Sequence, residues 1–240
     1  MATFLEIANN IAVKVRLPEM TGCFSSPDRN ARVIKLAIID STRRNIFKAF
    51  DWSFLLKKHT FATVNEVAAY NVPVDYDRII NNTVWNNTAQ RRISGPTNAQ
   101  KWALYQNDAF GVSSIDYTCK ILPSATGQKQ LNLEPEPTST EAISYYYISN
   151  KYIVSESTLV AAYTNDDDTS LFDDDLVEQA ALYRVLRTIG LDYGEEKYEY
   201  EQLLHERTSH DGGAENLKMD GPSEDTLILG ANTPLTGFGS

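Results

Sequence analysis

The sequence is short of the residues and patterns on which several classes of protein depend. It has only two cysteines, Cys23 and Cys119, which lie far apart and lack CxxC spacing. Neither a disulfide scaffold nor a structural zinc site is therefore indicated, and we expect two ordinary thiols. The longest apolar run of the first helical region, residues 33–39, is interrupted by Lys35. It is far shorter than the roughly 20 residues of a membrane span, so we expect no membrane association.

The N-terminus and the charge balance narrow the possibilities further. The first residues lack the basic leader and apolar stretch of a signal peptide, so we expect the chain to stay where it is made. The 240 residues carry 22 basic and 32 acidic side chains, a formal net charge of -10. This charge disfavours non-specific binding to DNA or to anionic membranes. With 42% hydrophobic residues, the chain is long enough to bury a substantial core.

Sequence motifs of catalysis are also missing. The three histidines, His59, His205 and His210, form no HExxH motif, and neither cysteine has a histidine near it in the sequence. There is no GxSxG elbow, no phosphate-binding glycine loop and no dinucleotide fingerprint. We therefore expect no enzyme and no cofactor, and we predict no catalytic residue. A spatial pair of carboxylates, as in glycosidases, is the alternative that spacing alone leaves open.

Two aspartate triplets, 166–168 and 173–175, raise the question of a bound cation, because hard cations prefer several oxygen ligands. The segment between them lacks the alternating ligands, the central glycine and the final glutamate of an EF-hand loop. The second triplet stands where a helix is expected to begin, and acids there complement the positive end of the helix dipole. We therefore interpret it as a helix cap and predict no metal site.

Charge and glycine are both distributed unevenly along the chain. Residues 1–60 have a net charge of +5, residues 61–165 of -2 and residues 166–240 of -13. Six of the 12 glycines fall within the last thirty residues, a composition that resists compact packing. The basic residues of the N-terminal part fit either a solvated face or a surface that complements the acidic C-terminal third.

The order of periodic segments predicts an α+β fold. Helical spacing opens at a Thr3–Glu6 capping box, alternation typical of strands dominates the middle, and helical spacing returns at about residue 176. The expected architecture is a helical bundle from the N- and C-terminal segments (1–56 and 166–210) with an inserted antiparallel β domain (57–165). An extended tail (211–240) follows. The clearest strand is expected at residues 115–121, and Pro73 favours an edge position for the strand near it.

The second helix, which begins after Asp28, has apolar residues on all sides of its first half. One arc is expected to hold Val33, Leu36, Ile39, Ile46, Phe47 and Phe50. Ile34 and Ile38 lie opposite, so this helix is expected to be buried on two sides, within its own domain or against another subunit. Arg43 projects from the apolar arc, either as a snorkelling surface arginine or as half of an inter-subunit ion pair. Ile34, Ile38 and Arg43 are therefore the predicted inter-subunit contacts.

Several segments resemble a known family. They are IFKAFDWSFL at 46–55, HTFATV at 59–64, YNVPVD at 70–75, FDDDLVEQAALY at 172–183 and a tyrosine-rich helix at 198–204. They resemble the head-to-tail adaptors (tubular protein A type) of short-tailed bacteriophages. The resemblance covers residues 1–207, and the glycine-rich tail beyond His210 departs from it.

The resemblance implies a non-enzymatic virion protein of the phage neck that assembles in the host cytoplasm. Its expected form is a homo-oligomeric ring, a dodecamer, between the portal protein and the tail nozzle protein. Double-stranded DNA is expected to pass through the lumen without specific binding, which suits an acidic surface. In the tail, Thr226, Leu227, Ile228 and Leu229 form a β-prone run that is expected to dock on the portal.

A polysaccharide-active enzyme or a carbohydrate-binding module of a phage tail is the alternative function. The 13 tyrosines, three tryptophans and many acids are the residues that such proteins use. However, Tyr145, Tyr146 and Tyr147 are consecutive, so in a strand they alternate between its two faces and cannot form one sugar platform.

Overall fold

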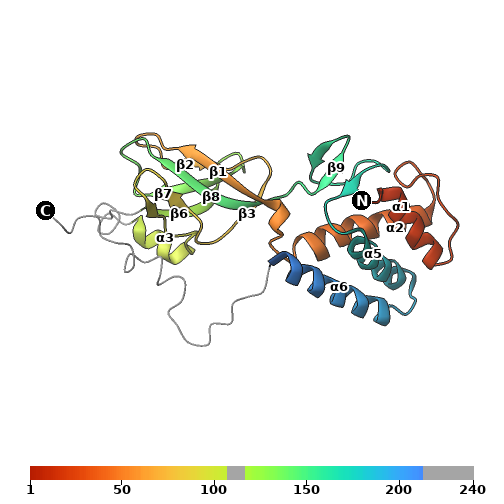
Figure 1. Cartoon of the computed structure of the whole chain (residues 1–240). Coiled ribbons are helices and arrows are strands. Elements are labelled where there is room, and N and C mark those ends of the chain that lie inside the picture. Colours follow the sequence, from red (N-terminus) through yellow and green to blue (C-terminus); the bar gives the residue numbers. More distant parts are fainter. Residues whose placement is uncertain (107–116, 213–240) are drawn as a thin grey trace, which may run out of the picture.

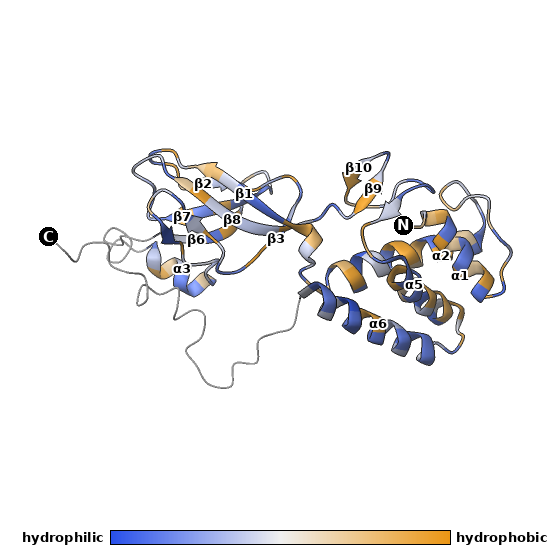
Figure 2. Ribbon diagram, viewed as in Figure 1, coloured by the Kyte–Doolittle hydropathy of each residue, from blue (hydrophilic) through white to orange (hydrophobic). Residues whose placement is uncertain are grey.

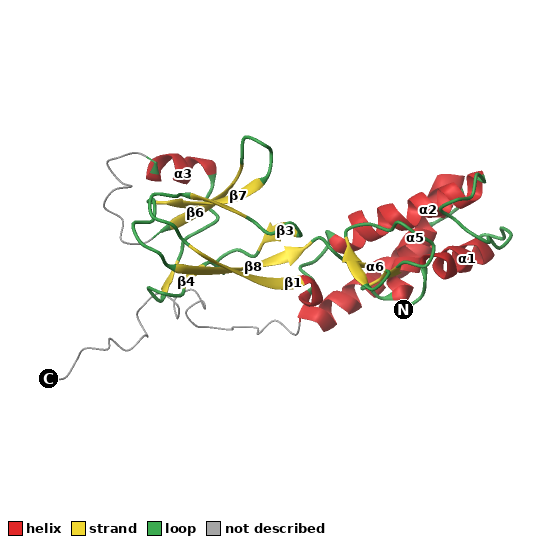
Figure 3. Ribbon diagram, turned by 90° about the horizontal axis from the view of Figure 1, so that it is seen from above, coloured by secondary structure: helices red, strands yellow, loops and turns green. Residues whose placement is uncertain are grey.

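The computed structural model describes residues 1–106 and 117–212. Helices gather at one end of an elongated molecule and strands at the other (Figures 1 and 3). We refer to residues 1–55 and 150–212 as the helical lobe and to residues 56–149 as the β lobe. The predicted class is confirmed: the fold is α+β, and both ends of the described chain contribute helices to one lobe while the strands are inserted between them.

The first two helices begin at the caps that the sequence predicts. The Thr3 hydroxyl accepts a hydrogen bond from the Glu6 amide, and the Glu6 carboxylate accepts one from the Thr3 amide, so a complete capping box opens α1 (Phe4–Lys14). The Asp28 carboxylate caps α2 (Arg29–Ser41). Beyond α2 the chain continues as a six-residue π-helix, η1 (Thr42–Phe47). A short 3-10 turn, η2 (Ser53–Leu55), then leads into the β lobe.

The two closing helices pack on the first pair. Asp173 caps α5 (Asp174–Ile189), and Gly190, at φ 80°, closes it in the left-handed conformation that glycine adopts without strain. Helix α6 (Gly194–Gly212) follows after a short turn. Helix α5 lies at the centre of the lobe, where it packs against α1, α2, η1 and α6. No helix in the described part of the chain is long and apolar enough to cross a membrane.

The β lobe consists of two antiparallel sheets. In the larger sheet, β8 (Ala142–Ser149) pairs with β1 (Leu56–Ala62) on one side and with β3 (Tyr76–Ile79) and β4 (Trp85–Asn86) on the other. Strand β5 (Arg91–Arg92) extends this sheet beyond β4.

The smaller sheet has the order β2 (Ala69–Asn71), β7 (Lys129–Glu134) and β6 (Thr118–Pro123), which places β2 at an edge, as Pro73 predicts. Strand β6 contains residues 118–121 of the strand expected at 115–121; Tyr117 precedes β6, and residues 115 and 116 lie outside the described chain. The short helix α3 (Ala99–Tyr105) also belongs to this lobe.

A third, small sheet belongs to the helical lobe. It has the order β10 (Thr158–Val160), β9 (Ile153–Ser155) and β11 (Thr169–Ser170). Thr3 forms a β-bridge with Thr169, and the Phe4 amide donates to the Asp168 carbonyl, so the N-terminus is bound to this sheet. Ile153 of β9 and Tyr163 lie in the same hydrophobic core as the helices, so this sheet packs with the helical lobe.

Each lobe has its own hydrophobic core. The helical core gathers the apolar faces of α1, α2 and α5 with Tyr152 and Phe172. The β core lies between the two sheets and contains Cys119, Ile143 and Tyr145. Figure 2 shows apolar residues along α5, which lies within the bundle, whereas α6 is largely hydrophilic along its length. Only Tyr200 of α6 is buried.

Candidate assembly surfaces

The aspartate triplets have structural roles. The Asp173 carboxylate accepts hydrogen bonds from the Asp175 and Leu176 amides, which makes it the N-cap of α5, as predicted. Asp166 accepts from the amides of Cys23 and Phe24 and thereby fixes the loop between α1 and α2. Among the described residues, no three His, Cys, Asp or Glu side chains gather in a way that could hold a metal ion.

The two thiols lie where nucleophilic chemistry is disfavoured. Both cysteines are fully buried. Burial, with a smaller contribution from the Asp166 carboxylate, raises the pKa of Cys23 to about 11. Burial raises the pKa of Cys119 to about 12. Because a cysteine reacts as the thiolate, neither side chain is activated at neutral pH.

The tyrosines of β8 alternate as their spacing requires. Tyr145 and Tyr147 are buried in the β core, and Tyr146 faces outward. The Tyr147 hydroxyl donates to Asp75, which holds it in the interior. The three tyrosines therefore form no single platform on this strand, as their consecutive positions predict.

Charged side chains connect the two lobes at their junction. The Arg78 guanidinium of β3 donates to the Asp51 carboxylate at 2.6 Å and to the Phe50 carbonyl at 2.8 Å, and it lies over the Phe47 ring. At the end of α6, the Asp211 carboxylate accepts from both the amide and the hydroxyl of Ser53. Arg78 thus links the β lobe to the segment before β1, and Asp211 fixes the same segment from within the helical lobe.

A hollow of about 310 Å³ lies beside this junction. Its apolar wall comes from Trp52, Phe54 and Phe172, whose rings lie edge to face or tilted against one another. Its polar wall comes from α6, where Arg207 pairs with Asp173 at 3.3 Å. The hollow thus lies where three segments that are far apart in the sequence meet.

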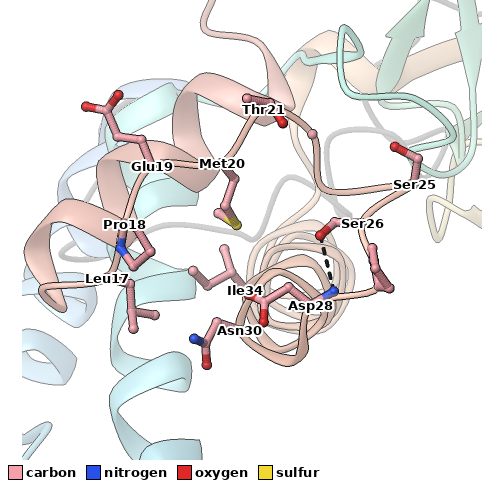
Figure 4. Close-up of a pocket in the computed structure, with 12 residues that line it drawn as sticks. Leu17, Pro18, Glu19, Met20, Thr21, Ser25, Ser26, Asp28, Asn30 and Ile34 are labelled. Carbon is pink, nitrogen blue, oxygen red and sulfur yellow. Dashed lines mark hydrogen bonds between the residues drawn. The ribbon is translucent and has the colours of Figure 1, made fainter.

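A second hollow, of about 440 Å³, opens under the loop between α1 and α2. Figure 4 shows Leu17, Met20 and Ile34 directed into it, with polar residues along its rim. One of these, Ser26, accepts a hydrogen bond from the Asp28 amide, which stabilises the start of α2. Two carboxylates, Glu19 and Asp28, line the hollow, and that of Asp28 already accepts a hydrogen bond from the Ala31 amide as the N-cap of α2.

A half-buried polar network attaches α5 and α6 to the π-helix. The Asn45 side chain accepts from Arg184 at 2.7 Å and donates to the Tyr183 hydroxyl, while the Asn45 carbonyl accepts from the Tyr200 hydroxyl at 2.9 Å. Arg184 also lies 3.6 Å from Asp40. Because this network occupies the inner side of α6, the opposite side of that helix is left facing solvent.

The described chain thus presents exposed helix faces and structural polar networks. The family model of the SU10 adaptor protein matches residues 2–215, and so spans both lobes. The chain belongs to this family. Membership confirms the resemblance to phage adaptors and indicates a structural role. No curated protein matches the chain.

Two of the predicted inter-subunit contacts in this family member are corrected by the structure. Ile34 and Ile38 are both 0% exposed, because they form the face of α2 that packs into the helical core. Neither side chain can reach a second subunit. Leu36, which was expected to face the core, is 60% exposed instead.

Of the remaining predicted site residues, the structure describes Arg43 but not the four residues of the tail. Arg43 is exposed and forms no ion pair with any residue that the structure describes. It therefore remains a predicted inter-subunit contact. Thr226, Leu227, Ile228 and Leu229 lie outside the described residues. The sequence analysis did not predict that Leu36 and Tyr198 lie on the surface. The acidic residues on either side of Tyr198 could have indicated its exposure.

Proposed function

We propose that the chain is the subunit of a ring that joins the portal at the capsid vertex to the tail of a phage, and that the genome passes through the lumen of this ring. The observation that carries the proposal is the family match over residues 2–215. The expected partners are the portal protein, the tail nozzle protein and further copies of this chain, in a dodecamer assembled in the host cytoplasm.

The shape and charge of the molecule support this role. Two lobes with separate cores place a helical surface and a β surface at opposite ends, so that one lobe can contact neighbouring copies while the other contacts a different protein (Figure 1). The net charge of -10 suits the wall of a channel, because like charges repel the phosphate backbone of DNA.

Electron cryomicroscopy of purified particles tests the proposal. A closed ring with this fold is expected between the portal and the tail, and particles assembled without the protein are expected to be DNA-filled heads that lack tails. Absence of the protein from the particles, or its location away from the neck, would refute the proposed function.

A further inference from the structure

The outer face of α6 carries acidic and aromatic residues that are not needed to hold the helix in place. Glu195, Tyr198, Gln202 and Glu206 follow one another at intervals of three or four residues and therefore share one face. All four are exposed, Tyr198 by 63%. We refer to these residues as the α6 stripe. Its position opposite Tyr200 leaves it free for another partner.

The outer face of α2 and η1 has the opposite charge. Arg29, Arg32, Leu36 and Arg43 follow one another at intervals of three, four and seven residues and are all exposed. We refer to them as the α2 stripe. The three arginines form no ion pair with any described residue. Asp40, which lies between Leu36 and Arg43, is already paired with Arg44 and Arg184.

The elements that carry the two stripes match in length and direction. Helix α2 and η1 together cover 13 and 6 residues, and α6 covers 19. Both elements run toward the β lobe (Figure 1). η1 ends just before Phe50, and a Cβ on Gly212 at the end of α6 would lie 3.0 Å from the Phe50 ring, so both finish at the same junction. Helix α5 packs between them, which keeps the stripes on separate surfaces.

We infer that the α2 stripe of one copy of this chain docks on the α6 stripe of the next copy, an inference that rests on the proposed ring. Because the two helices run in the same direction, a rotation about an axis parallel to them brings the stripes together with their corresponding ends aligned. Arg29 and Arg32 then lie level with Glu195, and Arg43 lies level with Glu206. Since the contact joins two different surfaces, it is heterologous, and a rotation that divides a full turn evenly closes it into the proposed ring.

Charge and apolar groups have separate roles in this contact. The arginines and glutamates select the partner surface and its register, because complementary charge contributes more to specificity than to affinity. Leu36 and Tyr198 supply the apolar surface that is removed from water when the two stripes meet. Tyrosine is enriched among binding hot spots. The acidic C-terminal segment (residues 166–240) of one copy thus contacts the basic N-terminal segment (residues 1–60) of the adjacent copy.

Exchange of charge between the stripes tests the contact. Variant A carries Arg32→Glu and Arg43→Glu, and variant B carries Glu195→Arg and Glu206→Arg. Each is supplied in trans to phage that lack their own copy, and the copies of the chain per purified particle are counted. We expect each variant alone to lose at least about 90% of incorporation, because like charges then face each other. An equal mixture should restore incorporation, because each reversed stripe meets a reversed partner.

The outcomes separate the two proposals. Normal incorporation of A and B alone, or failure of the mixture while both variants keep the wild-type melting temperature, would overturn the docking contact and leave the ring standing. Absence of the wild-type chain from particles would overturn the ring itself. The matched controls are Glu19→Arg and Arg187→Glu, exposed charge reversals in the helical lobe outside both stripes, which should incorporate normally.

A cross-linking experiment tests the same contact without any change of charge. Leu36→Cys and Tyr198→Cys are introduced together, and assembled particles are treated with a flexible bis-maleimide. Cys23 and Cys119 are 0% exposed and should not react. We expect a ladder of cross-linked chains from the double variant and single chains from either cysteine alone. Incorporated double variant that gives no ladder would overturn the contact.

Discussion

At the scale of single residues, the Asp75 carboxylate binds side chains from two strands of the β lobe. It accepts hydrogen bonds from Lys57 of β1 at 2.6 Å and from Tyr147 and Ser149 of β8 at 2.9 Å. Burial alone would raise the pKa of Asp75, but these hydrogen bonds and the Lys57 charge outweigh it and lower the pKa to about 2. The charged form of Asp75 thus stabilises the folded state.

We predict that Asp75→Asn destabilises the protein by about 2 kcal/mol at neutral pH, since a pKa unit corresponds to about 1.4 kcal/mol. The folded pKa lies below the ordinary value of 3.8, so the stabilisation is present above about pH 4 and is lost as the pH falls toward 2. Urea unfolding at several pH values measures this. The destabilisation caused by Asp75→Asn, relative to wild type, should shrink at low pH. An equal difference at all pH values contradicts the prediction.

The two cysteines give a second prediction at this scale. Because burial raises the pKa of Cys23 to about 11 and that of Cys119 to about 12, we expect a thiol reagent at neutral pH to label the native protein on the order of 100-fold more slowly than the denatured protein. Mass spectrometry of the labelled chain measures both sites. Rapid labelling of either thiol in the folded protein contradicts this expectation.

At the scale of elements, α6 depends on one buried side chain. Tyr200 packs beside Tyr183 and donates to the Asn45 carbonyl. We predict that Tyr200→Ala costs about 3 kcal/mol, as the loss of a buried aromatic side chain does, and releases α6 from the lobe. Hydrogen exchange should then lose protection across residues 194–212 while the β lobe keeps it. Tyr198→Ala, on the exposed face of the same helix, is the control and should leave exchange unchanged; equal effects of the two variants contradict the prediction.

The start of α5 tests the interpretation of the aspartates as caps. We predict that Asp173→Ala costs about 1 kcal/mol, because two amides of the first turn lose their acceptor. Asp167→Ala, at an exposed position between the structural aspartates Asp166 and Asp168, should have no effect on the melting temperature. A chelator should leave the melting temperature of the wild type unchanged. A fall in melting temperature on chelation would show instead that the carboxylates hold a cation.

The sequence predicted the helices and their caps well because those signals are local. It assigned the wrong face of α2 to the core, and two physical reasons account for this. Val33, Ile34, Leu36, Ile38 and Ile39 surround the helix, so hydropathy alone does not distinguish inside from outside. The π-helix η1 then adds a residue per turn and shifts the phase. A straight α-helix would place Leu36 and Phe47 on one face, yet only Phe47 is buried.

Strand pairing shows a similar limit. Alternation correctly indicated that strands dominate the middle of the chain, but it gave no information about which strands pair. β1 pairs with β8, so Phe61 lies opposite Ile143, and β2 pairs with β7 in another sheet. Consecutive strands are commonly neighbours, yet here the choice depends on which long-range pairing fills the core between the sheets. That choice is a property of the whole fold and of no single segment.

At the scale of the whole molecule, the lobe junction is also where the described chain ends. Asp211 binds Ser53, and Gly212 lies against Phe50, so α6 delivers the end of the described chain to the boundary between the lobes. Arg78 holds the β lobe to the same segment through Asp51 and the Phe50 carbonyl. Because α6 runs to Gly212, a truncation at the expected boundary of 210 would remove a carboxylate that stabilises the junction. A clean deletion of the tail must begin at residue 213.

We predict that deletion of residues 213–240 leaves the melting temperature unchanged but lowers attachment to portal-bearing heads by about tenfold or more, which corresponds to at least about 1.4 kcal/mol of binding free energy. The reason is that the β-prone run 226–229 is proposed to add its strand to the portal. Deletion of 233–240 alone, which keeps that run, should leave attachment intact, and Ile228→Asp in the full chain should weaken it, because a buried charge in a docked strand is costly. Sedimentation of heads with bound protein measures attachment. Equal attachment by the full chain and the 213–240 deletion would show that the lobes alone bind the portal.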